Sequence, residues 1–340
     1  MALAKTNDRL ICDIRLTVRK IKCSDIIQHD IIEDVFHIES DDLEREMRNY
    51  GFLTNSSKDL SLFLSEVVKK CSIEELREKL NHLKVWEIAT KNETKIWKAY
   101  TLHNSLRNTD KFINDAMKMK KELLKSFHIK SLNAIINVIC HENKLWCAIT
   151  GRKLTRRSGI KMEKPVFICY IPESPYLFTY PNMFPKEKLE RITRGLNFGI
   201  IKDCHLTGKN ISSLLKMVEQ RIDTNATSNI TLRPGNEIEV GNRHVDFSRN
   251  KQTKHYIDRC FNKNIALQKF VAEAISDWRG VDLTEIPEGH FSTVMEVSSD
   301  NIAETFLYYS TKLVIKPPFP RYIKNFQYSG KNVVKLRKKY

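Results

Sequence analysis

Six positive charges and one negative charge fall within fourteen residues near the middle of the chain. These residues, 151–164, lie between two apolar runs, 144–149 and 165–171, that are typical of β-strands. A pair of strands fixes the direction of the segment between them, so several cations would be held close together. Cations held in this way can bind the phosphate backbone of a nucleic acid. The alternative, which the sequence leaves open, is a solvated segment without a partner.

The composition restricts the classes of protein that fit. The chain has 340 residues and a net charge of +16, which favours a nucleic acid, an anionic membrane surface or an acidic protein as partner. No apolar run is long enough to cross a bilayer and the first residues lack the apolar core of a signal peptide, so we expect a cytosolic or nuclear protein. The eight cysteines form no Cys-x-x-Cys pair, which disfavours a zinc site and favours buried thiols.

The motifs of common enzyme classes are incomplete. The closest match to a P-loop, at Gly208, lacks both the first glycine and the hydroxyl of that motif. A zincin-like start at His141 has Leu145 where the second histidine belongs. The nucleophile elbow of hydrolases is missing as well. A carboxylate pair assembled from distant segments stays open, but we expect a protein that is not an enzyme, with no catalytic residue, cofactor or metal.

The first hundred residues predict a bundle of short helices. Serines at 24, 40 and 57 can each cap a helix, and Gly51 can end one of them. Ser72 and Glu75 have the spacing of a capping box, and apolar residues follow at helical spacing. Short helices joined by short links pack as a small bundle.

The pattern changes after residue 109, where helical and β-rich runs alternate and predict an α+β domain with an antiparallel sheet. Helices are expected over 109–126, 185–196 and 210–221, and strands over 131–140, 144–149, 166–171, 176–180 and 199–206. The polar residues 222–252 favour a linker. Beyond it we expect a helix over 253–279, a strand over 291–297, a helix over 301–309 and a strand over 332–336.

Five blocks of the sequence share one resemblance. Residues 164–179 contain Lys-Pro, an apolar strand with tyrosine, and Pro-Tyr-Leu-Phe-Thr. Residues 84–87 are Lys-Val-Trp-Glu, residues 142–146 are Glu-Asn-Lys-Leu-Trp, and strand-then-helix blocks follow at 200–216 and 291–306. In order and spacing these blocks resemble the centromere protein N (CENP-N) family, whose counterparts include Lys-Val-Trp-Asp, Glu-Asn-Ala-Val-Trp and Pro-Tyr-Ala-Phe-Thr. The resemblance is closest over residues 80–220.

The resemblance implies three parts. These are a pyrin-like, death-fold helical domain over 1–100, a CENP-L-homology α+β domain over 105–222, and a C-terminal α+β region over 223–340 that binds CENP-L. Family members are non-enzymatic adaptors of the inner kinetochore, in the nucleus at the centromere, and have no membrane partner. They bind nucleosomal DNA and the histone CENP-A, join other kinetochore subunits and support chromosome segregation in mitosis.

Matching positions bring the DNA-facing cations of the family onto this chain. Arg15 and Lys20 match basic positions of the first helix, and Lys209 matches a basic residue after a strand. Together with the basic segment, the expected DNA-binding residues are Arg15, Lys20, Arg152, Lys153, Arg156, Arg157, Lys161, Lys164, Lys202 and Lys209. Such cations bind phosphate oxygens and do not read base sequence.

One position departs from the family. Two acids one turn apart in the first helix hold an arginine of CENP-A there, whereas this chain has Asp8 at the first position and Cys12 at the second. A thiol is a weaker acceptor than a carboxylate. Asp8 and the adjacent Asp13 are therefore the candidate histone contacts, and loss of CENP-A recognition is the alternative.

Two other functions stay open. A structural subunit, including a paralogue closer to CENP-L, would use the basic surface to bind an acidic protein in place of DNA. A metal-dependent nuclease would need clustered acids near the basic segment, where Glu163 stands alone in the sequence. Duplex binding that depends steeply on salt is expected only if the protein binds nucleic acid, as an adaptor or as a nuclease.

Overall fold

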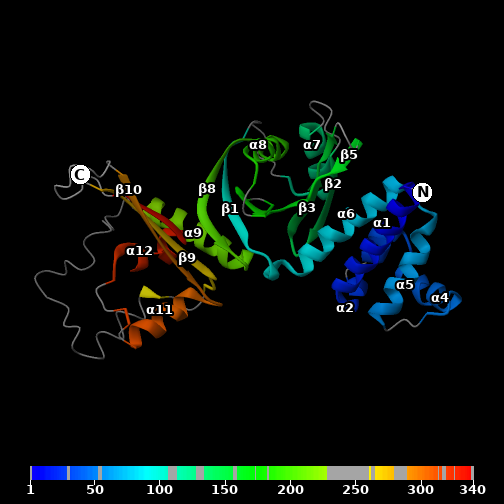
Figure 1. Cartoon of the computed structure of the whole chain (residues 1–340), viewed down its shortest axis with the longest axis horizontal. Helices are drawn as coiled ribbons and strands as arrows, with labels where there is room; N and C mark the ends of the chain where they lie inside the picture. Colours follow the sequence, from blue (N-terminus) through cyan, green and yellow to red (C-terminus); the bar gives the residue numbers. More distant parts are fainter. Residues whose placement is uncertain are drawn as a thin grey trace, which may run out of the picture. The chain divides into compact units, whose positions relative to one another are not determined.

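The chain divides into two compact units, residues 1–94 with 101–202 and residues 95–100 with 203–340. The computed structural model (Figure 1) confirms a mixed α+β class with an antiparallel sheet. The three-domain scheme with boundaries near 100 and 222 stays a prediction. The structure describes residues 2–28, 31–52, 56–105, 113–127, 134–155, 159–172, 174–181, 184–227, 260–261, 265–278, 289–312, 314–315, 319–324 and 326–337.

The first unit begins with six helices, as the sequence pattern predicts. They are α1 (Ala2–Lys20), α2 (Cys23–Gln28), α3 (Ile31–Phe36), α4 (Ser40–Asn49), α5 (Ser57–Val67) and α6 (Ile73–Thr90). Two of the expected caps are wrong. Glu39 is the N-cap of the helix that begins at Ser40, and Ser56 is the N-cap of the helix that begins at Ser57. The expected capping box begins α6, because the Ser72 hydroxyl accepts from Glu75 N–H at 3.3 Å and the Glu75 carboxylate accepts from Ser72 N–H at 2.7 Å. Gly51 follows α4 with a φ of +76°, a conformation that favours glycine.

Six strands form the largest sheet, in the order β2-β3-β6-β7-β1-β8. They are β1 (Trp97–Ser105), β2 (Ile135–His141), β3 (Lys144–Thr150), β6 (Val166–Tyr170), β7 (Tyr176–Tyr180) and β8 (Phe198–Gly208). The pairs β2–β3, β3–β6 and β6–β7 are antiparallel. Strands β4 (Arg152–Thr155) and β5 (Gly159–Met162) pair as a separate hairpin, and α7 (Ala116–Phe127) and α8 (Lys186–Gly195) complete this unit.

Helix α6 is the hub of the first unit, because α1, α3 and the β2–β3 pair all pack against it. A buried polar triad fixes it on the sheet. Asn81 Nδ2 donates to Asn137 Oδ1 at 2.7 Å, and Thr150 Oγ1 donates to Asn81 Oδ1 at 2.6 Å. Each of these three side chains is less than a tenth exposed. Since buried amides must find partners, the triad specifies one position of α6 along the strands.

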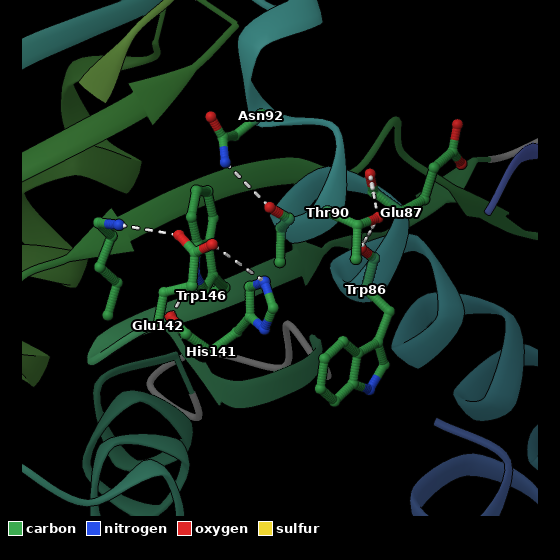
Figure 2. A network of polar contacts seen from close by, with 9 residues as sticks. Trp86, Glu87, Thr90, Asn92, His141, Glu142 and Trp146 are labelled. Carbon is green, nitrogen blue, oxygen red and sulfur yellow. Dashed lines mark hydrogen bonds and ion pairs between the residues drawn. The ribbon is translucent and has the colours of Figure 1, made fainter. Parts of the chain in front are cut away.

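The second half of α6 lies beside the turn of the β2–β3 hairpin (Figure 2). The Trp86 and His141 rings meet edge to face with centroids 5.6 Å apart, and Trp146 Nε1 donates to the His141 carbonyl at 3.2 Å. On the side toward α3, Trp86 Nε1 donates to Asp34 Oδ2 at 2.9 Å, and His82 Nε2 lies 2.9 Å from the same oxygen. Trp86 thus connects α3, α6 and the sheet.

The second unit contains a three-stranded sheet in the order β10-β9-β11, with β9 (Lys269–Trp278), β10 (Gly289–Ser298) and β11 (Val333–Arg337). Its helices include α9 (Ile211–Thr227), α11 (Ile302–Thr311), α12 (Arg321–Lys324) and α13 (Phe326–Ser329). The rings of Phe261, Phe270, Phe306 and Phe326 pack together in its core. The buried Asn332 side chain donates to Thr207 O and Lys269 O and accepts from Thr207 N–H, which joins β8 to β9.

Two expectations for this unit are wrong. Residues 269–278 form strand β9, whereas the sequence pattern favoured a helix over 253–279. Residues 222–227, which were expected to begin a linker, instead form the last turns of α9. The rest of the expected linker, residues 228–252, lies outside the described residues, as do residues 253–259. No helix in the described part of the chain is both long and apolar enough to cross a membrane.

Replacing Asn81 by alanine tests the triad. The Asn137 and Thr150 side chains lose their buried partner, so we expect the free energy of unfolding to fall by about 2–3 kcal/mol. Urea denaturation followed by circular dichroism measures this loss. Asn49→Ala, at an exposed position on α4, serves as control and should cost about 0.5 kcal/mol or less. An equal effect of both substitutions would mean that the triad does not hold α6 on the sheet.

Acid should weaken the Asp34 contact. Burial is the largest single influence on Asp34 and raises its pKa. The contacts with His82 and Trp86 lower it, and together they outweigh burial, so the pKa of Asp34 lies below the ordinary value of 3.8. A lowered carboxyl pKa stabilises the fold above the ordinary value and loses this effect as pH falls through the folded value. The stability difference between the wild type and Asp34→Asn should therefore be present at pH 5 and shrink as the pH falls below 3.8. A difference that is independent of pH would contradict this assignment.

Candidate nucleic-acid interface

The basic segment is a β-hairpin in the structure, where the sequence analysis expected a loop. Strands β4 and β5 pair antiparallel, and their register places the backbone of Lys153 directly opposite Lys161. Glu163 N–H donates to Gly151 O at 2.9 Å, which continues the pairing toward β3 and β6. Arg156 and Arg157 lie outside the described residues, as do the side chains of Lys153 and Lys161. The segment is therefore a separate two-stranded hairpin whose base is closed by the backbone hydrogen bond between Glu163 and Gly151.

Two ion pairs anchor the base of this hairpin. Arg152 Nη2 lies 2.6 Å from Glu74 Oε2 on α6, and the Lys188 ammonium on α8 pairs with the Glu163 carboxylate. A Cβ at position 151 would lie 2.5 Å from Glu163 Oε2, so a larger residue there would push the Glu163 carboxylate aside. Glu163, the acid of the basic segment, is thus engaged in fixing the hairpin to α8.

Helix α6 carries a row of cations that the sequence analysis missed. Arg77, Lys84 and Lys91 are seven residues apart, so they drift by only about 20° per step around the helix. We call them the α6 row; Arg77 and Lys84 lie on α6, and Lys91 caps its C-terminus. All three side chains are half-buried. A rise of 1.5 Å per residue gives the row a length of about 21 Å.

Lys20 and Arg152 reach α6 from opposite sides of this row. Lys20 Nζ lies 3.5 Å from Glu87 Oε1, and Arg152 pairs with Glu74. Glu87 follows Lys84 by three residues and Glu74 precedes Arg77 by three, so they are offset from the row by about 60° in opposite directions. The structure thus brings Lys20 and Arg152 to the two flanks of one band of positive charge.

The charges in this band influence one another. Burial, the largest influence, lowers the pKa of Lys84, and the charge of Lys20 lowers it as well. Asp13 and Glu87 act in the opposite direction. A half-buried ammonium beside another cation is stabilised by an added anion, so Lys84 marks a place where an external anion would be favoured.

The other expected DNA contacts are more scattered. Arg15 lies on α1 five residues before Lys20, so it is turned from it by about 140°. Lys164 and Lys202 are exposed, the first after β5 and the second on β8. Lys209 belongs to the second unit, where its backbone N–H donates to Gln268 Oε1 at 2.7 Å. The first unit alone therefore gathers Lys20, Arg152 and the α6 row.

The candidate histone contacts do not share a face of α1. Asp8 is exposed near the start of α1, and Asp13 lies five residues on, which turns it by about 140°. The Asp13 carboxylate attracts the Lys84 ammonium and raises its pKa, so Asp13 already has a partner within the protein. Asp8 and the exposed Cys12, which are one turn apart, are better placed to meet a partner together.

Comparison with known proteins leaves the chain without a family assignment, because no protein-family model and no curated protein matches it. Within the described ranges, no three His, Cys, Asp or Glu side chains lie close enough together to hold a metal ion.

The Lys84 environment can be measured directly. After reductive methylation with 13C-formaldehyde, the Lys84 dimethylamine resonance should titrate with a pKa below the ordinary lysine value of 10.5. Asp13→Asn should lower this pKa further, because it removes an attractive charge, and Lys20→Gln should raise it. Asp8→Asn is the control and should leave it unchanged. A Lys84 pKa that responds equally to both aspartate substitutions would refute the assigned contact.

Proposed function

We propose that the protein is a non-enzymatic adaptor of the inner kinetochore, similar to the CENP-N family, that binds nucleosomal DNA. The observation that carries the proposal is the band formed by Lys20, the α6 row and Arg152. These cations come from three separate elements, α1, α6 and β4, that a common helix holds together. A net charge of +16 would add attraction at longer range.

The dimensions of the band suit a duplex. Its length of about 21 Å corresponds to about six base pairs at 3.4 Å each. Lysine and arginine on a rigid helix would contact phosphates along this length without reading bases. The hairpin adds to this argument through its backbone register alone, which pairs Lys153 with Lys161.

The finer parts of the proposal rest on the five sequence blocks. They support a pyrin-like first domain, a CENP-L-homology domain, pairing of the C-terminal region with CENP-L, and a place in the nucleus at the centromere.

One feature of the second unit favours a protein partner for that unit. Strand β10 is an outer strand of its three-stranded sheet and exposes Val294 by 59%, and such edges are sites of strand addition. Recognition of CENP-A through Asp8 is part of the proposal and calls for a separate test.

Duplex binding should depend steeply on salt. If about six cations neutralise phosphates, the slope of log K against log salt concentration should be close to −5. Substituting Arg77, Lys84 and Lys91 with glutamine should reduce the magnitude of this slope by about 3. Fluorescence anisotropy with a labelled duplex of unrelated sequence measures both quantities. The matched control replaces Lys58, Lys69 and Lys70, exposed on α5 and the turn after it, and should leave the slope unchanged.

Charge reversal of the hairpin gives the complementary test. Glutamate at positions 152, 153, 156 and 157 should abolish duplex binding and leave the circular dichroism spectrum unchanged. Full binding by this variant, or binding that ignores salt, would refute the proposal. If the protein does not bind DNA but binds an acidic subunit, the structural-subunit alternative is supported. Magnesium-dependent cleavage of the duplex would support the nuclease alternative.

A further inference from the structure

Glu74 bridges two arginines that belong to different elements. Its Oε1 lies 3.0 Å from Arg77 Nη1 on α6, and its Oε2 lies 2.6 Å from Arg152 Nη2 on β4. A single carboxylate thus presents one negative charge through two oxygens to two guanidinium groups. A phosphodiester presents the same charge through its two non-bridging oxygens, and arginine forks suit both groups.

We propose that Arg77 and Arg152 form a phosphate-binding pair that the Glu74 carboxylate occupies in the free protein, and that a DNA phosphodiester displaces it. This inference rests on the proposed function. Glu74 acts as an internal competitor that sets the affinity of the interface, so the protein is a weaker polyanion binder than its cations alone would make it.

The surroundings allow this exchange. The Glu74 side chain is 59% exposed, so it can turn toward solvent, whereas Arg77 and Arg152 are only 22% and 25% exposed and stay in place. Arg152 also has a spare donor, because its buried Nε has no hydrogen-bond acceptor among the described residues. An exposed ion pair contributes little to stability, so its loss is readily offset by contact with a phosphate.

The position of Glu74 is what distinguishes it from its neighbour on the helix. Glu78 lies one turn further along α6, is similarly exposed, and pairs with Lys120 of α7 at 3.5 Å. It therefore carries the same charge on the same helix without contacting either arginine of the pair, in the contacts that the structure describes.

Glu74→Gln and Glu78→Gln therefore form a matched pair for duplex-binding measurements on the full chain. Both remove one negative charge. Only Glu74→Gln frees the arginine pair, so it should tighten duplex binding about fivefold and increase the magnitude of the salt slope by about 1. Glu78→Gln should change the affinity less than about twofold, as expected of a screened surface charge. Adding Arg152→Gln to Glu74→Gln should remove the gain.

The outcomes separate this inference from the proposed function. If the wild type binds the duplex and Glu74→Gln binds it equally or more weakly, the carboxylate does not compete and the inference fails, while DNA binding stands. Equal gains from both glutamine variants would also overturn it, because general charge would then explain them. If neither the wild type nor Glu74→Gln binds the duplex, the proposed function itself fails.

Discussion

The first unit depends on one constraint, which is that α6 must bury its surface against three different neighbours. Helices α1 and α3 and the β2–β3 pair pack on it, and Asn81 locks it to the strands through Asn137 and Thr150. An amphipathic helix in a small bundle usually buries one stripe of its surface. Helix α6 instead packs against neighbours on several sides. The positions that remain half-open include Arg77, Lys84 and Lys91. Packing thus leaves Arg77, Lys84 and Lys91 on one narrow side of α6, whereas Lys79 turns toward α3, where its ammonium donates to Val35 O at 2.7 Å.

The same packing explains how this charge is tolerated. Lysines and arginines bury their aliphatic stems and keep their charged ends near water, so half-buried positions suit them. Glu74 and Glu87 then pair with cations that arrive from the hairpin and from α1. These pairs fix the positions of Arg152 and Lys20 more than they stabilise the fold, because exposed ion pairs contribute little free energy. A surface prepared in this way loses little entropy when an anion binds.

Local signals in the sequence were sufficient for much of the fold. Ser72 and Glu75 predict the start of α6, and the prediction is confirmed because a capping box depends only on residues three apart. Strand β9 was mistaken for helix, since Ala272, Glu273 and Ala274 favour helices in isolation. Its pairing with β10 and β11 overrides that preference. Strand β1 was missed for a similar reason, because its neighbours β7 and β8 come at least seventy residues later in the chain.

The site was less accessible to sequence reasoning than the fold. The charge density of 151–164 indicated the hairpin, but nothing local shows that Arg152 meets Glu74, 78 residues away. The α6 row does have a signal in the sequence, which is a cation every seven residues. This spacing indicates a binding surface only when the structure shows that other elements cover α6 on both sides of the row. Arg15 shows the converse, because it lies only five residues before Lys20 in the sequence but on a different face of α1.

Protection of lysines from acetylation tests the central claim most directly. The full chain would be treated with limiting acetic anhydride, with and without a saturating duplex, and the modified lysines quantified by mass spectrometry. We predict that the duplex protects Lys20, Lys84 and Lys91 together and leaves Lys58 and Lys69 of the α5 region as reactive as before. Equal protection of both groups, or protection of neither, would contradict a phosphate-binding band organised by α6.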